Sequence, residues 1–181
     1  MAKRKFTSNL SVEGIKNTQQ QLRNYQQQLN DKNAIFVKRV SESGIAVAKQ
    51  NVGGFGKYIT FSTKVNQSGS NCKAVLVATE NGKIKNQWKT SEGIQSADVS
   101  PLLMAEFGSG QYAENPLGVP GVGQGTFPNQ THAFDKEGWY WQDLNDQWHH
   151  SYGVSPTMPM YKAMLEMYAN IKKIAKEVFG S

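Results

Sequence analysis

A regular apolar stripe near the C-terminus is the feature that most constrains how this chain can fold. Its members follow one another at steps of four and three residues: Met160, Met164, Met167, Ile171, Ile174 and Val178. That spacing places them on one face of an α-helix. Two prolines precede the stripe and Gly180 follows it, so we expect an amphipathic helix over residues 156–180. The three methionines are expected to pack in the core.

Two further helices are predicted in the first fifty residues. Ser8 or Ser11 can cap the first, and Asn30-Asp31-Lys32-Asn33 is expected to break it. A second helix then runs over residues 34–50, is weakened in its middle by Gly44 and stops before Gly53-Gly54. The apolar positions of the first helix share one face: Val12, Ile15, Leu22, Tyr25 and Leu29. Its other faces are polar, which is typical of a surface or subunit-interface helix.

Residues 58–90 have the composition of β-strands. Residues 58–65 are rich in β-branched and aromatic side chains and predict a strand, followed by a turn over residues 66–71. Residues 72–79 alternate apolar side chains on both faces, which favours a central strand. Asn81-Gly82 then predicts a hairpin that leads into a third strand over residues 83–90.

The segments that follow are more varied. Residues 102–107 fit either a short helix or a strand, because periodicity does not decide between them. Residues 111–131 are expected to form a loop rich in glycine and proline, which is either functional or disordered; in assembly proteins such loops often order only against a neighbouring subunit. Residues 138–142 and 147–151 predict a β-hairpin stabilised by cross-strand aromatic pairs, with tryptophans on both strands: Trp139, Trp141 and Trp148.

This order of elements predicts an α+β fold, with an antiparallel sheet between two N-terminal helices and a long C-terminal helix. The 181 residues are expected to form one domain: a helical segment over 1–50, a β-rich core over 55–151 and the helix over 156–180. The longest apolar run is far too short to span a bilayer, so no membrane partner is expected. The lone Cys72 and the lack of a secretory segment favour assembly in a reducing cytoplasm.

Charge is unevenly distributed along the chain. Residues 1–50 carry nine Lys or Arg against three Asp or Glu, whereas residues 101–160 carry one against six. Such a chain can stack on copies of itself or bind nucleic acid through its basic half, and the distribution can equally serve solubility alone. We therefore expect the following residues at subunit interfaces: Lys16, Arg23, Glu106, Glu114, Asp135 and Glu137.

No residue pattern indicates an active site. His149 and His150 are adjacent strand residues that point to opposite faces, so they do not readily share a metal ion. Cys72 lies among apolar residues, which indicates burial rather than nucleophilic reactivity. The glycines of residues 118–125 lack the Gly-Lys-Ser/Thr ending of a phosphate-binding loop. We therefore predict no catalytic residues, no metal and no cofactor.

Three stretches in one order carry a family resemblance. They are Leu103-Met104-Ala105-Glu106-Phe107-Gly108-Ser109-Gly110, then Gly138-Trp139-Tyr140-Trp141 with Trp148 across a turn, then Pro156-Thr157-Met158-Pro159-Met160-Tyr161-Lys162-Ala163. Together they resemble the neck or tail-completion family of tailed bacteriophages, the small head–tail joining proteins. Ser109 stands where that family usually has threonine.

The resemblance implies a non-enzymatic virion protein that forms a homo-oligomeric ring, assembled in the host bacterial cytoplasm. Its implied partners are other copies of itself and the tail terminator or head-completion (connector) proteins, with DNA only as cargo in the ring lumen. The alternative, from a different class, is a carbohydrate- or cell-wall-binding domain in which Trp139, Trp141 and Trp148 form a sugar platform. A weaker third possibility is a basic nucleic-acid-binding protein.

Overall fold

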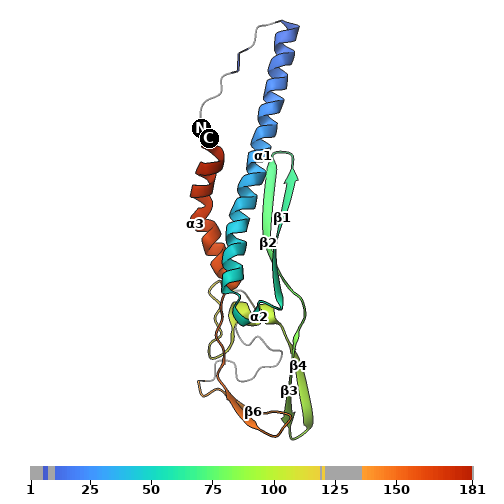
Figure 1. The fold of residues 1–181 in the computed structure, drawn as a ribbon, viewed down its shortest axis with the longest axis vertical. Coiled ribbons are helices and arrows are strands. Elements are labelled where there is room, and N and C mark those ends of the chain that lie inside the picture. The colour runs from blue at the N-terminus through green and yellow to red at the C-terminus, as the bar shows by residue number, and fades with distance from the viewer. Residues whose placement is uncertain (1–5, 8–10, 119, 121–135, 181) are drawn as a thin grey trace.

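A computed structural model of the chain describes residues 6–7, 11–118, 120 and 136–180. The molecule is elongated, with the long helix α1 as its main axis (Figure 1). Helix α3 and the β1–β2 hairpin both pack on α1, and the remaining strands lie beyond its C-terminal end (Figure 1). The elements follow in the order α1 (Val12–Asn51), a 3₁₀ turn (Gly53–Phe55), β1 (Ile59–Ser68), β2 (Asn71–Glu80), β3 (Ile84–Thr90), β4 (Gly93–Val99), α2 (Pro101–Phe107), β5 (Ser109–Gly110), β6 (Trp139–Gln142), β7 (Trp148–Ser151), β8 (Gly153–Val154) and α3 (Pro159–Phe179).

The prediction of two N-terminal helices is wrong, because α1 is one helix of 40 residues. Ser11 is its N-cap and accepts a hydrogen bond from the Gly14 N–H at 3.0 Å. The expected break at residues 30–33 contains neither glycine nor proline, so it costs only a few tenths of a kcal/mol per residue in helix propensity. A side-chain hydrogen bond from Gln27 to Asp31, one helical turn later, helps to carry the helix through this segment.

Gly44 lies where α1 packs closely against two neighbouring elements. A Cβ at this position would lie 2.8 Å from Met167 Cγ of α3 and 3.0 Å from Leu76 Cδ1 of β2. The glycine is therefore a point of close packing within a continuous helix. It lets α3 and the β1–β2 hairpin pack on α1 at the same level.

The strands form three separate antiparallel sheets among the described residues, which corrects the prediction of one sheet. Among the strands that the structure describes, β1 and β2 pair only with each other, so β2 is not central; the turn between them is much shorter than residues 66–71. β3 pairs with β4, a strand that was not predicted, in a four-stranded sheet of order β4-β3-β6-β7. β5 pairs with β8.

Asn81-Gly82 is not a hairpin turn, since β2 does not pair with β3. The Asn81 N–H donates to Tyr58 O at 2.8 Å, and the Asn81 amide donates to Thr60 Oγ1 at 2.8 Å. These contacts hold Asn81 against the start of β1. The chain therefore leaves one sheet at this turn and enters the next. The sequence correctly placed a turn at Asn81-Gly82, but the strand pairing that it predicted across this turn is wrong.

The core is small and lies where α1, β1, α2 and α3 meet. Its buried members come from all four elements: Ala48, Val52, Ile59, Phe61, Ala105 and Ala163. Residues 101–107 are helical, which settles the ambiguity of this segment in favour of a helix. The α+β class and the long C-terminal helix are confirmed, and the structure shows that this helix packs on the first one.

The predicted stripe of α3 is largely the face that packs on the body. Ile174 and Val178 are buried, whereas Met160, Met164 and Met167 are only half-buried and Ile171 is exposed. Met160 packs against the core. The prediction of core methionines is therefore only partly correct. Ala163, fully buried in the first half of α3, lies one position before Met164 and outside the predicted stripe.

Candidate functional site

Glu106, the acid in the Glu-Phe-Gly stretch, caps the last helix. Its Oε2 accepts the Met160 N–H and its Oε1 accepts the Tyr161 N–H, both at 2.8 Å. These donors lie in the first turn of α3, where N–H groups lack partners within the helix and a negative charge is favourable. The adjacent Ala105 carbonyl accepts from the N–H groups of Thr157 and Met158 at 2.9 and 3.0 Å. α2 thereby fixes where α3 begins.

The next residues of this stretch fit tightly against the segment before α3. Gly108 has φ +68°, and a Cβ there would lie 2.5 Å from Val154 O and 2.7 Å from Pro156 Cδ. The buried Ser109 accepts the Val154 N–H at 3.1 Å through its Oγ. Gly110 has φ +62°, and its Cβ would lie 2.7 Å from the Trp139 ring. Both glycines permit contacts that no other residue allows.

Ser100, just before α2, joins this region to the β1–β2 hairpin. It accepts the Leu103 N–H at the start of α2 and donates to Glu80 Oε2 at 2.5 Å. Glu80 also pairs with Lys83. The Lys83 ammonium first, and the Ser100 hydroxyl next, hold the pKa of Glu80 below its ordinary value.

The predicted tryptophan hairpin is confirmed as β6 and β7, with Trp141 opposite His149 and Gln142 opposite Trp148. Its cross-strand ring pairs join aromatic residues to histidines rather than tryptophan to tryptophan. Trp141 stacks on His149 at a centroid distance of 4.5 Å, on the same face as Trp139. Because Trp139 packs beside Gly110, this face of the hairpin is the one joined to the α2–β5 region.

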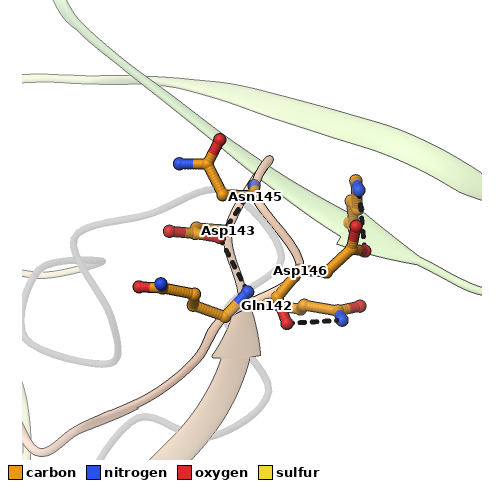
Figure 2. Close-up of polar contacts among 6 residues, drawn as sticks. Gln142, Asp143, Asn145 and Asp146 are labelled. Atoms are coloured by element: carbon orange, nitrogen blue, oxygen red, sulfur yellow. Dashed lines mark hydrogen bonds and ion pairs between the residues drawn. The ribbon is translucent and has the colours of Figure 1, made fainter.

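The turn of the hairpin is ordered by Asp143 (Figure 2). Its Oδ1 accepts the N–H groups of Asn145 and Gln147 at 2.8 and 2.9 Å, and its Oδ2 lies 3.1 Å from His149 Nε2. The Gln147 N–H first, then the His149 ring, hold the pKa of Asp143 below its ordinary value. Asp146, with φ +64°, pairs with Lys89 of β3 at 2.7 Å, which ties the turn to the neighbouring strand.

The other face of the hairpin is aromatic and open to solvent. Tyr140 is 69% exposed and stacks on His150 at 4.1 Å, with the ring planes 6° apart. His150 in turn contacts Tyr152 at 4.4 Å between ring centroids, and its Nε2 lies 2.6 Å from Glu137 O. Trp148 is 68% exposed on this same face. The sequence predicted the hairpin but did not show that Trp148 lies on the opposite face from Trp139 and Trp141.

The predicted interface residues lie at different places. Lys16 and Arg23 are exposed on the N-terminal half of α1, and Glu114 is exposed after β5. Glu137 is exposed beside the hairpin, and Asp135 lies outside the described residues. Glu106 is engaged inside the chain, as a cap. Asp143 and Asp146, which helped to make residues 101–160 acidic, also have partners within the chain.

The residues weighed as chemical candidates do not converge. His149 faces Trp141 and Asp143, whereas His150 faces Tyr140, so the two rings point to opposite sides as predicted. Cys72 is half-buried on β2. In the described part of the chain, no three His, Cys, Asp or Glu side chains are grouped to hold a metal ion. Nor does any helix there have the length and apolar character to cross a membrane.

No family model, curated protein or solved structure matches this chain. The functional argument therefore rests on the geometry of the chain. In the structure, the three stretches singled out in the sequence meet at one place. We call this place the motif junction: Glu106, Gly108, Ser109 and Gly110 against Trp139, Val154, Pro156 and the first turn of α3.

Proposed function

We propose that this chain is a structural subunit of a tailed bacteriophage or related particle, which forms a homo-oligomeric ring at the neck and joins head to tail. It has no catalytic role. Its neighbours along the axis are tail terminator or head-completion proteins, and DNA passes through the ring lumen. The protein is assembled in the host bacterial cytoplasm and ends in the virion.

The motif junction is the observation that carries the proposal. Residues 103–110, 138–148 and 156–163 resemble the same family in the same order. The first of these segments hydrogen-bonds to the first turn of α3 in the third and packs against Trp139 of the second. Residues that are far apart in sequence but form one structural unit make a more specific resemblance than three independent short matches. The unit is a scaffold, because its polar groups are used for hydrogen bonds within the chain.

The shape of the molecule supports an assembly subunit. The N-terminal half of α1 extends beyond α3 and the β1–β2 hairpin (Figure 1). A helix without packing on its apolar face is marginal in water, so such an extension is typical of a chain that is completed by neighbours. Lys16 and Arg23 lie on this half of α1, available to an acidic surface of an adjoining subunit.

The gene order and a deletion test the proposal. A portal gene on one side and a major tail protein gene on the other would support it. Deleting the gene from the particle that encodes it should leave filled heads and separate tails in electron micrographs, and supplying the wild-type chain should restore joined particles. Joined, infectious particles in the deletion strain would overturn the proposal.

A second function is favoured by the exposed aromatic face of the hairpin. Tyr140, His150 and Trp148 offer flat rings to solvent, as a carbohydrate platform does. On this alternative, the protein binds purified bacterial cell-wall polysaccharide, and Trp148→Ala removes binding while the melting temperature stays unchanged. Leu144→Ala, in the exposed turn, is the matched control. Failure of the wild-type chain to bind any such polysaccharide would rule this function out.

A further inference from the structure

The β1–β2 hairpin has two long open edges. Its strands pair with each other without a bulge from Ile59↔Glu80 to Ser68↔Asn71, and no other strand that the structure describes pairs with either of them. Neither strand contains a proline, which would block the addition of a further strand. Long open edges are usually avoided in soluble proteins, because their unpaired N–H and C=O groups can bind another strand. The hairpin therefore offers a surface for strand addition on each side.

The register shows which backbone groups point out of each edge. The Asn81 N–H donates to Tyr58 O, one pair beyond Ile59↔Glu80, so the even-numbered residues of β1 bond to β2. Hydrogen bonding alternates along an antiparallel pair, so the odd-numbered residues of β1 turn their N–H and C=O groups away from β2. On β2 the even-numbered residues, from Cys72 to Glu80, turn theirs away from β1. Each edge thus carries five residues with outward backbone groups.

These two edges complement each other in identical copies. β1 and β2 run in opposite directions, so a second copy in the same orientation brings its β2 antiparallel to β1. The outward groups on both edges belong to residues whose side chains face α1, as those of Phe61 and Leu76 do, so both copies then hold α1 on the same side of the joined sheet. One kind of contact closes both edges, whereas a strand of an unrelated protein would fit one edge and leave the other open.

The charges on the hairpin agree with this pairing. The face away from α1 contains two lysines and no acid: Thr60, Ser62, Lys64, Asn66 and Ser68 on β1, and Asn71, Lys73, Val75, Val77 and Thr79 on β2. If copies repeat the register of the hairpin, Lys64 lies opposite Val75 and Lys73 lies opposite Asn66, so no like charges meet.

The helices indicate which face of a joined sheet turns inward. α1 covers one face of the hairpin and α3 lies beyond α1 (Figure 1). Because the helices are the bulkier layer, a closed sheet carries them on its outside and turns Lys64 and Lys73 toward its lumen. A basic, acid-free lining is complementary to the phosphates of DNA.

We propose that β1 of one copy pairs with β2 of the next, so that the hairpins of a ring form one closed antiparallel sheet around the lumen. The contact joins different surfaces of the two copies, and such contacts can close into a ring, whereas twofold contacts stop at a dimer. The right-handed twist between neighbouring strands provides the curvature. The inference rests on the proposed function in that the chain forms a ring around DNA. It adds the surface that joins the copies and the side that faces the DNA.

Cysteine cross-linking tests the pairing in the full-length chain with Cys72→Ser. Two single-cysteine variants, Ser62→Cys on β1 and Val77→Cys on β2, are co-expressed with tags of different mass and oxidised in the lysate. Between copies these positions form non-hydrogen-bonded pairs with Cα atoms about 4.5 Å apart, within reach of a disulfide. We expect the mixed dimer to form about tenfold faster than a dimer of either variant with itself. Val75→Cys and Thr79→Cys in place of Val77→Cys measure the register.

Two controls separate edge pairing from chance collision. Ser96→Cys, an exposed residue on the edge strand β4 of another sheet, should cross-link with Ser62→Cys no faster than exposed thiols collide. Val65→Pro, added to the Ser62→Cys chain, should abolish the mixed dimer, because it removes an N–H that points out of the β1 edge. Circular dichroism spectra like that of the wild type establish that each variant is folded.

Two results overturn the proposal. Ser62→Cys dimers as abundant as mixed dimers would mean that two β1 edges pair about a twofold axis. Mixed dimers that form no faster than with Ser96→Cys, for all three β2 variants, would mean that the edges do not meet.

The two proposals fail in different experiments. If the mixed dimer forms selectively while the deletion strain still makes joined particles, the strand pairing stands and the neck function falls. If the deletion separates heads from tails while cross-linking is unselective, the neck function stands. The ring must then use another surface.

Discussion

Replacing Glu106 with alanine is the most direct test of the motif junction. The change leaves the N–H groups of Met160 and Tyr161 without the carboxylate that accepts both at 2.8 Å. Loss of a helix cap costs about 0.5–2 kcal/mol, and a hydrogen bond to a charged group contributes about 1.5–3 kcal/mol. Because Glu106 is only partly buried, water can hydrogen-bond to the freed N–H groups and offset part of this loss of stability. We expect a loss of about 2–3 kcal/mol in the free energy of unfolding.

The assay is urea unfolding followed by circular dichroism, with a thermal melt beside it. For a chain of this size 2–3 kcal/mol corresponds to a fall of about 4–12 °C in the melting temperature. Glu106→Gln keeps one acceptor oxygen and should lose about half as much. Glu114→Ala, an exposed acid after β5, is the control and should change stability by less than about 0.5 kcal/mol. If Glu106→Ala is as stable as Glu114→Ala, the capping argument is wrong.

Two further predictions concern the same region. Gly108→Ala should lower the free energy of unfolding by about 3 kcal/mol or more, because its Cβ would meet Val154 O at 2.5 Å. Gly118 also has a positive φ, but a Cβ there meets nothing within 4 Å, so Gly118→Ala should cost only about 1 kcal/mol; urea titration of both variants measures the difference. The lowered pKa of Glu80 means that its stabilising contribution is full above the ordinary value of 4.5 and is lost as pH falls from there through the folded-state pKa. The stability difference between wild type and Glu80→Gln should therefore shrink over that acidic range, and a constant difference would contradict the assignment.

The sequence predicted elements well where the pattern is local and repeated. The C-terminal helix and the tryptophan hairpin depend on neighbours three to twelve residues apart, and both elements are confirmed. The expected break in α1 was wrong because a run of weak helix formers without glycine or proline costs less than the continuous helix gains. Propensity is a weak guide where a long amphipathic pattern continues on both sides.

Pairing between elements was the part that the sequence did not determine. Asn81-Gly82 has the residues of a hairpin turn, yet the bonds of Asn81 to Tyr58 and Thr60 come from an element more than twenty residues earlier. The cap made by Glu106 was missed for the same reason, since its acceptors and donors are 54 and 55 residues apart. Only the order of the motifs in the sequence indicated that these segments belong together.

The motif junction and the exposed N-terminal half of α1 lie far apart, and their independence can be measured. Leu22 is 26 residues before Ala48, which places it about 39 Å along α1 from the core that Ala105 shares. Effects at sites so far apart are expected to add within about 0.5 kcal/mol. The losses of unfolding free energy in Glu106→Ala and Leu22→Ala should therefore sum in the double variant, measured by urea unfolding. A departure from that sum well above about 0.5 kcal/mol would mean that α1 transmits the state of the junction along its length.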